Sequence, residues 1–223
     1  MRGVTVRPKV KEWLVFAAFL VLAIGLRISS FFKTVIDPDE TLYLLISREM
    51  LRGQVLYTGL WDHKPPGIFA VYAAIQTALG ESIFAMRLAA CIVVATTCYL
   101  LYRLGTFIGG GRERYGLLAG LLYVVYSLNM GGLAANTEIF FTPLITLAFY
   151  LLFTAEQYPV RLVGPGSLRV FLIGLLLGLG LQINYVVLFA FVAVALIVGG
   201  ALYAARKSMT ALLKQAFATY ALL

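Results

Sequence analysis

Long apolar segments recur along the whole chain and constrain its fold more than any other feature. Segments rich in Leu, Val, Ile, Phe and Ala begin near residues 13, 84, 115, 139, 170 and 186. About 20 apolar residues of helix are needed to cross the roughly 30 Å hydrocarbon core of a bilayer. Hydrophobic residues make up 61% of the 223 positions and charged residues 13%, which is outside the range of soluble domains. The sequence therefore predicts an all-α integral membrane protein.

The apolar segments predict six membrane spans within one transmembrane domain, residues 1–223. These spans are residues 13–32, 84–104, 115–130, 139–155, 170–183 and 186–204. A seventh apolar segment, residues 68–79, is too short, because about 14 helical residues at 1.5 Å each reach only about 21 Å. We predict that this segment and the amphipathic residues 41–51 are juxtamembrane helices lying in the interface or, for 68–79, re-entering the membrane. Both belong to a polar loop, residues 33–83.

The distribution of charge predicts the orientation of the spans. If residues 68–79 do not span the membrane, basic residues gather on the cytoplasmic side and acidic residues on the outer side. The cytoplasmic side receives the basic N-terminus, Arg103, Arg112, Arg114, Arg161, Arg169, Arg206, Lys207 and Lys214. The outer side receives Asp37, Asp39, Glu40, Glu49, Asp62, Glu81 and Glu138. Cytoplasmic loops are enriched in Lys and Arg. This enrichment accounts for the net charge of +8 without a nucleic-acid partner. The sequence predicts a multi-pass protein of the plasma or inner membrane, with a cytoplasmic N-terminus.

The first two apolar spans contain Arg27, Cys91 and Cys98. The first span is longer than the 7–15 apolar residues of a signal peptide, so we predict that it is not cleaved. Arg27, near its far end, is predicted to extend toward the interface. Cys91 and Cys98 are predicted to be small buried hydrophobes rather than metal ligands or a disulfide.

The stretch from Asp37 to Gly67 is rich in side chains that could act in catalysis or binding. It holds five of the ten acidic residues and the single histidine. Asp37 and Asp39 precede a predicted helix, so either could be its N-cap instead of a catalytic group. His63 beside Asp62 could be a base, a metal ligand or a polar loop residue.

Aromatic and acidic residues of the same stretch leave further alternatives. The side chains of Tyr43, Tyr57 and Trp61 are interpreted as interfacial anchors, with stacking on a sugar as the alternative. The acidic residues could instead hold a divalent cation, although we favour a site without a cofactor.

Several spaced motifs resemble the bacterial protein O-mannosyltransferase-like enzymes. These are I-D-P-D-E-T-x-Y at residues 36–43, S-R-E-M-L-x-G at 47–53, H-K-P-P-G at 63–67, Arg87 at the next span, and A-N-T-E at 135–138. The pattern is similar to glycosyltransferase family 39, which includes the lipid A aminoarabinose transferases and has the GT-C fold. The resemblance implies a polytopic GT-C-type helix bundle whose first outer loop carries the catalytic acid. Family members are about twice as long or longer, so the chain is expected to be the N-terminal part of such a module.

The resemblance also implies a reaction and a set of site residues. The donors are polyprenyl-phosphate sugars, the acceptor is a hydroxyl of a lipid, polysaccharide or protein, and a single displacement gives inversion. Asp39 is expected to be the base, with Glu40 and Glu138 orienting the acceptor or tuning Asp39. Lys64 is expected to stabilise the leaving phosphate, with Arg87 as a second cation. The members' further Lys, which contacts the donor phosphate near the sixth span, corresponds to Asn184, which can donate a hydrogen bond to the phosphate but carries no charge.

Two other classes of function are consistent with an apolar polytopic chain. A transporter would line a path through the bundle with intramembrane charges. The acidic residues here gather instead at one predicted face, and the later spans hold few ionisable groups. The second alternative is a non-catalytic remnant that keeps the loop but lacks the helices completing the donor groove.

Overall fold

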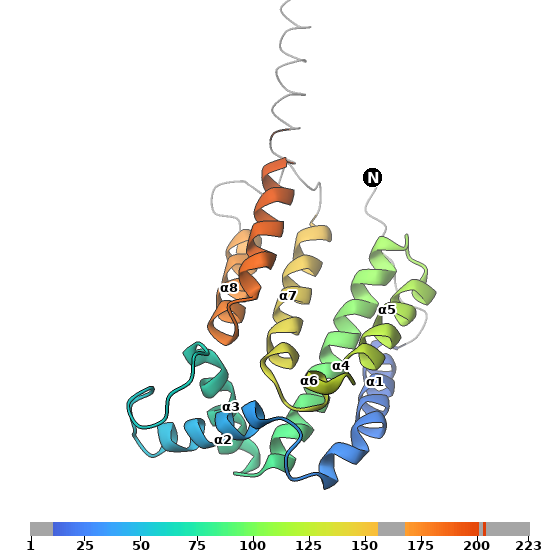
Figure 1. Ribbon diagram of the computed structural model, residues 1–223. Helices are drawn as coiled ribbons and strands as arrows, with labels where there is room; N and C mark the ends of the chain where they lie inside the picture. The colour runs from blue at the N-terminus through green and yellow to red at the C-terminus, as the bar shows by residue number, and fades with distance from the viewer. Residues whose placement is uncertain (1–10, 156–167, 201–202, 204–223) are drawn as a thin grey trace, which may run out of the picture.

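The computed structural model describes residues 11–155, 168–200 and 203, and within these residues every regular element is a helix (Figure 1). The helices in chain order are α1 (Glu12–Arg27), the 3-10 helix η1 (Ile28–Phe32), α2 (Pro38–Leu51), α3 (Pro66–Leu79), α4 (Ile83–Ile108), α5 (Glu113–Tyr126), α6 (Met130–Leu133), α7 (Thr137–Phe153) and α8 (Leu168–Ile183). One more helix follows over Val187–Gly200. The predicted all-α class is confirmed for the described residues.

Two of the predicted spans have the length that a membrane crossing needs. Glu12–Phe32 forms 21 residues of apolar helix and α4 forms 26. The spans predicted at 115–130, 139–155, 170–183 and 186–204 correspond to shorter helices, such as α5 with 14 residues and α7 with 17. The end of the last predicted span lies outside the described residues. A polytopic arrangement therefore stays a prediction for these four segments.

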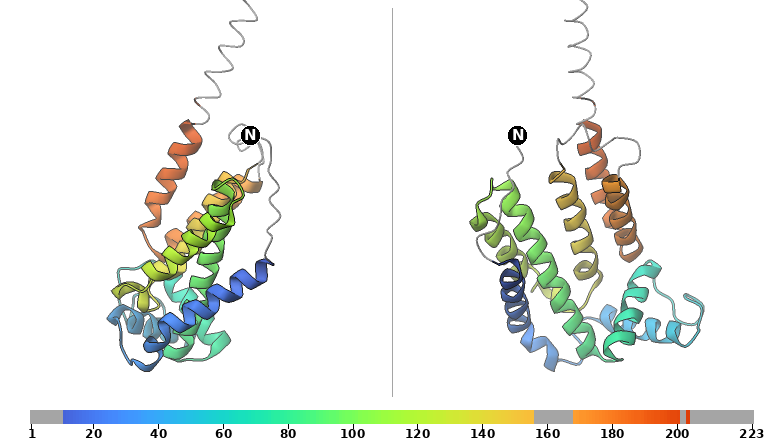
Figure 2. Two further views of the ribbon diagram at one scale, coloured as in Figure 1. Left: turned by 90° about the vertical axis from the view of Figure 1, so that its right-hand side faces the viewer. Right: turned by 180° about the vertical axis from the view of Figure 1, so that it is seen from behind.

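Helix α4 is the central element of the bundle. It packs on α1, α5 and α7, and α8 packs on α7 (Figure 2). The approach of α5 to α4 depends on Gly116, where a Cβ atom would collide with the carbonyl oxygen of Tyr102. Small residues at such crossings let apolar helices pack closely in a membrane.

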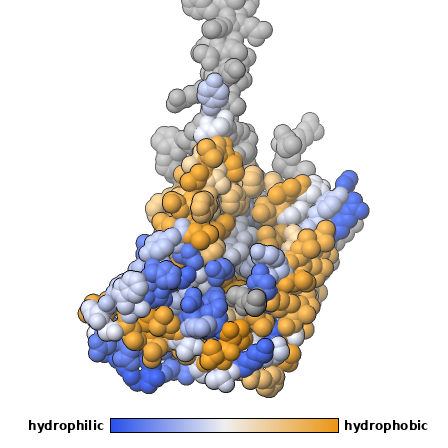
Figure 3. All heavy atoms as spheres, viewed as in Figure 1, coloured by the Kyte–Doolittle hydropathy of each residue, from blue (hydrophilic) through white to orange (hydrophobic). Residues whose placement is uncertain are grey.

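Helices α2 and α3 lie at one end of the bundle and pack against each other (Figure 1). Each has 14 residues. The two short helices predicted within residues 33–83 are thus confirmed, although α2 begins at Pro38 rather than at residue 41. The earlier start has a local cause: Asp37 caps the helix and Pro38 occupies its first turn, where a proline loses no hydrogen bond. In Figure 3 hydrophilic residues gather over this end, and apolar residues cover much of the helical bundle above it.

The loop region is hydrogen-bonded to the connection before α7, which is in turn hydrogen-bonded to the turn after α8. The side-chain amide of Asn136, just before α7, donates to Asp37 Oδ2 over 3.0 Å. The amide of Asn184, just after α8, donates to the hydroxyl of Thr137 over 2.8 Å. The segments carrying Asp39 and Glu138 therefore lie at one end, as the sequence predicted from the charges.

Arg27 corrects a prediction. Its side chain does not extend to an interface but is 1% exposed. One guanidinium nitrogen donates to the carbonyl and hydroxyl oxygens of Ser127, over 2.6 and 2.8 Å, and to the carbonyl of Gly132 over 3.2 Å. These carbonyls lie where α5 ends and α6 turns, so they are acceptors left free by the helix. Arg27 consequently ties α1 to α5 and α6.

A second polar cluster ties the helices near the start of α1. Glu12 accepts hydrogen bonds from the Tyr99 hydroxyl over 2.6 Å and from Arg103 over 2.8 Å. Arg103 also donates to the Tyr150 hydroxyl of α7 over 3.0 Å. Cys91 and Cys98 are buried free thiols in α4, as predicted.

Cysteine labelling tests the predicted orientation. Lys64 and Glu138 lie at the loop end, and the exposed Arg114 lies at the start of α5. We expect Lys64→Cys and Glu138→Cys to react in intact cells with an impermeant maleimide, and Arg114→Cys to react only after the cells are opened. The native cysteines are buried and give a low background. Labelling of position 114 but not of positions 64 and 138 in intact cells would reverse the orientation.

Candidate functional site

Asp39, the predicted catalytic base, lies at the start of α2. The side chain of Asp37 accepts the backbone N–H of Asp39 over 2.9 Å, so Asp37 is the N-cap. Asp39 lies in the first turn of the helix and is half-buried. Negative charge is stabilised there by the helix dipole. The structure answers the question of which aspartate caps the helix, and it leaves the carboxylate of Asp39 available for another role.

Tyr43 lies one helical turn after Asp39 and binds it. Its hydroxyl donates to Asp39 Oδ2 over 3.1 Å. The ring is 1% exposed and packs edge-on against Phe69 and Tyr72 of α3. The prediction that Tyr43 anchors the interface or stacks on a sugar is therefore wrong, because packing of α2 on α3 encloses the ring.

The charges of three carboxylates act on the Tyr43 hydroxyl. Burial raises the pKa of the Tyr43 hydroxyl, and the nearby charges of Asp39, Asp62 and Glu138 raise it further. These groups come from α2, from the loop before α3 and from the first turn of α7. Tyr43 therefore stays a neutral donor near three separate acidic side chains.

Glu40 forms a buried ion pair with Arg87 at the start of α4. The guanidinium donates to both carboxylate oxygens, over 3.2 and 2.8 Å, and the two side chains are 0% and 1% exposed. Glu40 also accepts the backbone N–H of Ala135 over 3.1 Å. Arg87 donates further to the carbonyl oxygens of Ser30 and Lys33. This pair joins α2 to α4, η1 and the connection before α7.

The buried pair changes two assignments made from the sequence. Glu40 was expected to orient the acceptor or tune Asp39, and Arg87 to bind the donor phosphate. Both side chains are instead enclosed and engaged with each other, with no surface that a substrate reaches. We therefore assign them to holding the loop on the bundle.

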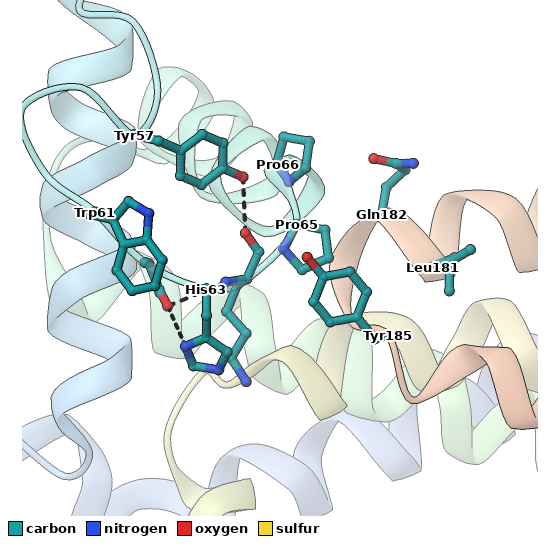
Figure 4. Close-up of a pocket in the computed structure, with 10 residues that line it drawn as sticks. Tyr57, Trp61, His63, Pro65, Pro66, Leu181, Gln182 and Tyr185 are labelled. Atoms are coloured by element: carbon teal, nitrogen blue, oxygen red, sulfur yellow. Dashed lines mark hydrogen bonds and ion pairs between the residues drawn. The ribbon is translucent and has the colours of Figure 1, made fainter.

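A cavity of about 480 Å³ opens between the loop before α3 and the end of α8. It is lined by Tyr57, Trp61, Asp62, His63, Lys64, Pro65, Pro66, Leu181, Gln182 and Tyr185. Figure 4 shows Trp61 and His63 on one side of it and Leu181, Gln182 and Tyr185 on the other. The H-K-P-P-G motif thus forms one wall of a cavity whose opposite wall comes from more than 110 residues later in the chain.

Asp62 organises the loop wall of this cavity. Its side chain is buried and lies 2.9 Å from His63 Nδ1. The same oxygen accepts the backbone N–H of Lys64 over 3.3 Å. His63 is therefore paired with a carboxylate, and the half-buried Lys64 contributes an ammonium group to the cavity lining.

Two other predicted residues lie near this end but not in the cavity wall. Glu138 is exposed in the first turn of α7, where its carboxylate accepts the Thr137 hydroxyl over 3.2 Å. Asn184 is buried and binds Thr137 and the backbone N–H of Val186. Its amide holds α7 against the turn after α8, so Asn184 supports the cavity rather than lining it.

Sequence reasoning missed Gln182 and Tyr185 as cavity residues, and it favoured an interfacial role for Tyr57, with stacking on a sugar as the alternative. Their positions depend on how α3 meets α8. A Cβ atom at Gly67 would collide with the carbonyl oxygen of Gln182, so the glycine allows this close contact. The glycine of H-K-P-P-G was the available signal, but it does not indicate which helix approaches.

The described residues contain no group of three or more His, Cys, Asp or Glu arranged to hold a metal ion. The carboxylates near Tyr43 come from three different elements, and Asp62 is engaged with His63 and Lys64.

Comparisons with known proteins place this chain in a family. The model of the dolichyl-phosphate-mannose-protein mannosyltransferase family matches residues 63–223, most of the chain. The chain belongs to this family. The matched region begins at His63, so it takes in Lys64 and the cavity wall from the end of α8, whereas Tyr57, Trp61 and Asp62 of the loop wall lie before it. The resemblance stated from the motifs is thereby confirmed.

Curated relatives narrow the relationship within the family. The chain is 31% identical over 176 residues to undecaprenyl phosphate-alpha-4-amino-4-deoxy-L-arabinose arabinosyl transferases of Yersinia pestis (strain Pestoides F) and Yersinia pseudotuberculosis (serotype O:1b). The alignment covers 74% of this chain and 30% of each relative. The chain thus spans about a third of the length of these relatives. No solved structure matches it significantly.

Proposed function

We propose that the protein is a membrane glycosyltransferase that transfers a sugar from a polyprenyl-phosphate donor to an acceptor hydroxyl at the outer membrane face, with inversion. The observation that carries the proposal is that Asp39 and the cavity lined by Lys64 lie at the same end of the bundle. Tyr43 binds Asp39 and lies within electrostatic reach of Asp62, and Asp62 binds the backbone of Lys64. The relatives are named as transferases that use an undecaprenyl-phosphate sugar, which supports the same donor class.

The proposed chemistry is one displacement at the anomeric carbon. The acceptor oxygen attacks that carbon while Asp39 takes the hydroxyl proton. The bond from the carbon to the donor phosphate oxygen breaks, and polyprenyl phosphate leaves with the electron pair. The Lys64 ammonium stabilises the charge that develops on the phosphate. Tyr43, as a neutral donor, orients the Asp39 carboxylate toward the acceptor.

A transporter is less well supported by the described structure. Transport through the bundle would need charged groups that line a path. The charged residues found within the helices, such as Arg27, Arg87 and Arg103, are instead engaged with Ser127, Glu40 and Glu12.

Replacement of Lys64 tests the donor assignment. In the intact protein we expect Lys64→Ala to lower transfer from undecaprenyl-phosphate-linked 4-amino-4-deoxy-L-arabinose about 10- to 100-fold, because one cation facing the phosphate is lost. Lys64→Arg keeps the charge and should retain more activity. The measurement is transfer of radiolabelled sugar in proteoliposomes that contain total envelope extract as the source of acceptor.

The control for this experiment is Arg52→Ala. Arg52 is an exposed cation of the same loop that pairs with Glu49 and does not line the cavity. Its loss should change transfer less than twofold, because exposed ion pairs contribute little. Equal activity of the Lys64→Ala and Lys64→Arg variants would remove Lys64 from the site.

A further inference from the structure

Tyr57 has an unusual backbone conformation. Among the residues that the structure describes, it is the one non-glycine residue with positive φ, at +69°. Glycine and asparagine adopt this left-handed region readily, whereas a bulky aromatic residue rarely does. Such a conformation costs free energy and persists only where surrounding contacts hold it, which is often at a functional site.

Contacts of the Tyr57 side chain maintain this backbone conformation. Its ring packs edge-on against Phe69 of α3, with 6.1 Å between the ring centroids. Its hydroxyl donates to the backbone carbonyl of Lys64 over 2.9 Å (Figure 4). The residue also borders a second cavity of about 400 Å³ that α2 lines on the other side. Tyr57 therefore lies between two cavities, and its hydroxyl is hydrogen-bonded to Lys64, seven residues later in the chain.

Both backbone polar groups of Lys64, its N–H and its carbonyl oxygen, are consequently hydrogen-bonded. Tyr57 binds its carbonyl oxygen, and Asp62 binds its N–H. Pro65 follows directly, and its ring fixes the next φ angle. A lysine side chain is long and flexible, so the direction in which it leaves the loop depends on this backbone.

We propose that Tyr57 is a positioning residue for Lys64. Its hydroxyl and left-handed backbone close the loop from 57 to 64, so that the Lys64 ammonium faces the cavity where the donor phosphate binds. The inference rests on the proposed function and adds a residue that acts through Lys64 without touching the donor.

The first test is Tyr57→Phe in the intact protein, which keeps the ring and removes the hydroxyl. We expect kcat/KM for undecaprenyl-phosphate-linked 4-amino-4-deoxy-L-arabinose to fall about 3- to 10-fold, the size of effect of losing one neutral hydrogen bond. Most of the fall should be in kcat, because Lys64 acts on charge that develops in the transition state. The melting temperature should stay unchanged, since the lost bond is exposed.

The matched control is Thr58→Val. Thr58 is the next residue, and its hydroxyl donates to the carbonyl of Val55 over 2.7 Å without reaching Lys64. This variant also removes one hydroxyl-to-carbonyl bond from the loop, and its kcat/KM should change less than twofold. An equal loss in both variants, or a loss that follows a lower melting temperature, would overturn the proposal.

A double-mutant cycle decides whether Tyr57 acts through Lys64. If it does, Tyr57→Phe should have no further effect in the Lys64→Ala background. Independent, multiplicative losses would overturn the inference. Wild-type donor use by Lys64→Ala would instead refute the role of Lys64, and no transfer by the unaltered protein would refute the proposed function itself. An impaired Lys64→Ala with a normal Tyr57→Phe would refute only the role of Tyr57.

Discussion

Asp39→Asn is expected to lower the rate of sugar transfer about 10²- to 10⁴-fold, the usual contribution of a general base. Asparagine has nearly the same shape as aspartate and its amide oxygen can still accept the Tyr43 hydroxyl. The helix cap is not affected, because that role belongs to Asp37. The protein should therefore fold normally and still bind undecaprenyl phosphate. Transfer is measured in proteoliposomes, with protein level, melting temperature and binding of radiolabelled undecaprenyl phosphate measured alongside.

Asp37→Asn is the matched control for Asp39→Asn. The two aspartates are two residues apart, and asparagine caps helices about as well as aspartate. Asp37→Asn should therefore retain near wild-type transfer. If Asp39→Asn kept its turnover, Asp39 would not be the base. Glu138 would then be the next candidate, because it is exposed at the same end of the bundle.

Glu40→Gln is expected to destabilise the protein by about 3–5 kcal/mol, because it leaves the buried Arg87 guanidinium without its charged partner. The two side chains are 0% and 1% exposed, so water cannot replace the lost carboxylate. Thermal unfolding in detergent should show a melting temperature lower by on the order of 10 °C. The loss of activity should follow the loss of folded protein rather than a change in chemistry.

Two further variants distinguish the stability effect of the buried Glu40–Arg87 pair from that of an exposed ion pair. Glu49→Gln removes the carboxylate of the exposed pair with Arg52 and should cost about 0.5 kcal/mol or less. The double variant Glu40→Leu with Arg87→Met replaces the buried pair by apolar residues and should be more stable than Glu40→Gln alone. A fully stable Glu40→Gln would show that the pair does not hold the loop on the bundle.

The local features of this site could be predicted from the sequence because short-range physics decides them. Apolar segment length and charge asymmetry indicate a membrane protein whose polar loop lies at one end. An aspartate followed by a proline at the start of an amphipathic stretch predicts a capped helix, although the sequence left both Asp37 and Asp39 as candidates for the cap. Lys64 before two prolines was singled out through its motif, and it lies within the residues that the family model matches.

The tertiary structure alone decided which charges are free to act on a substrate. Glu40 and Arg87 lie 47 residues apart, and only the tertiary structure reveals that their side chains satisfy each other. Arg27 was predicted at an interface and is buried against Ser127, 100 residues away. The cavity likewise needs the end of α8, whose residues carry no motif that points to Lys64. Hydropathy and capping act over a few residues, whereas the pairing of buried charges depends on contacts between distant helices, and a single sequence does not encode those contacts in a readable pattern.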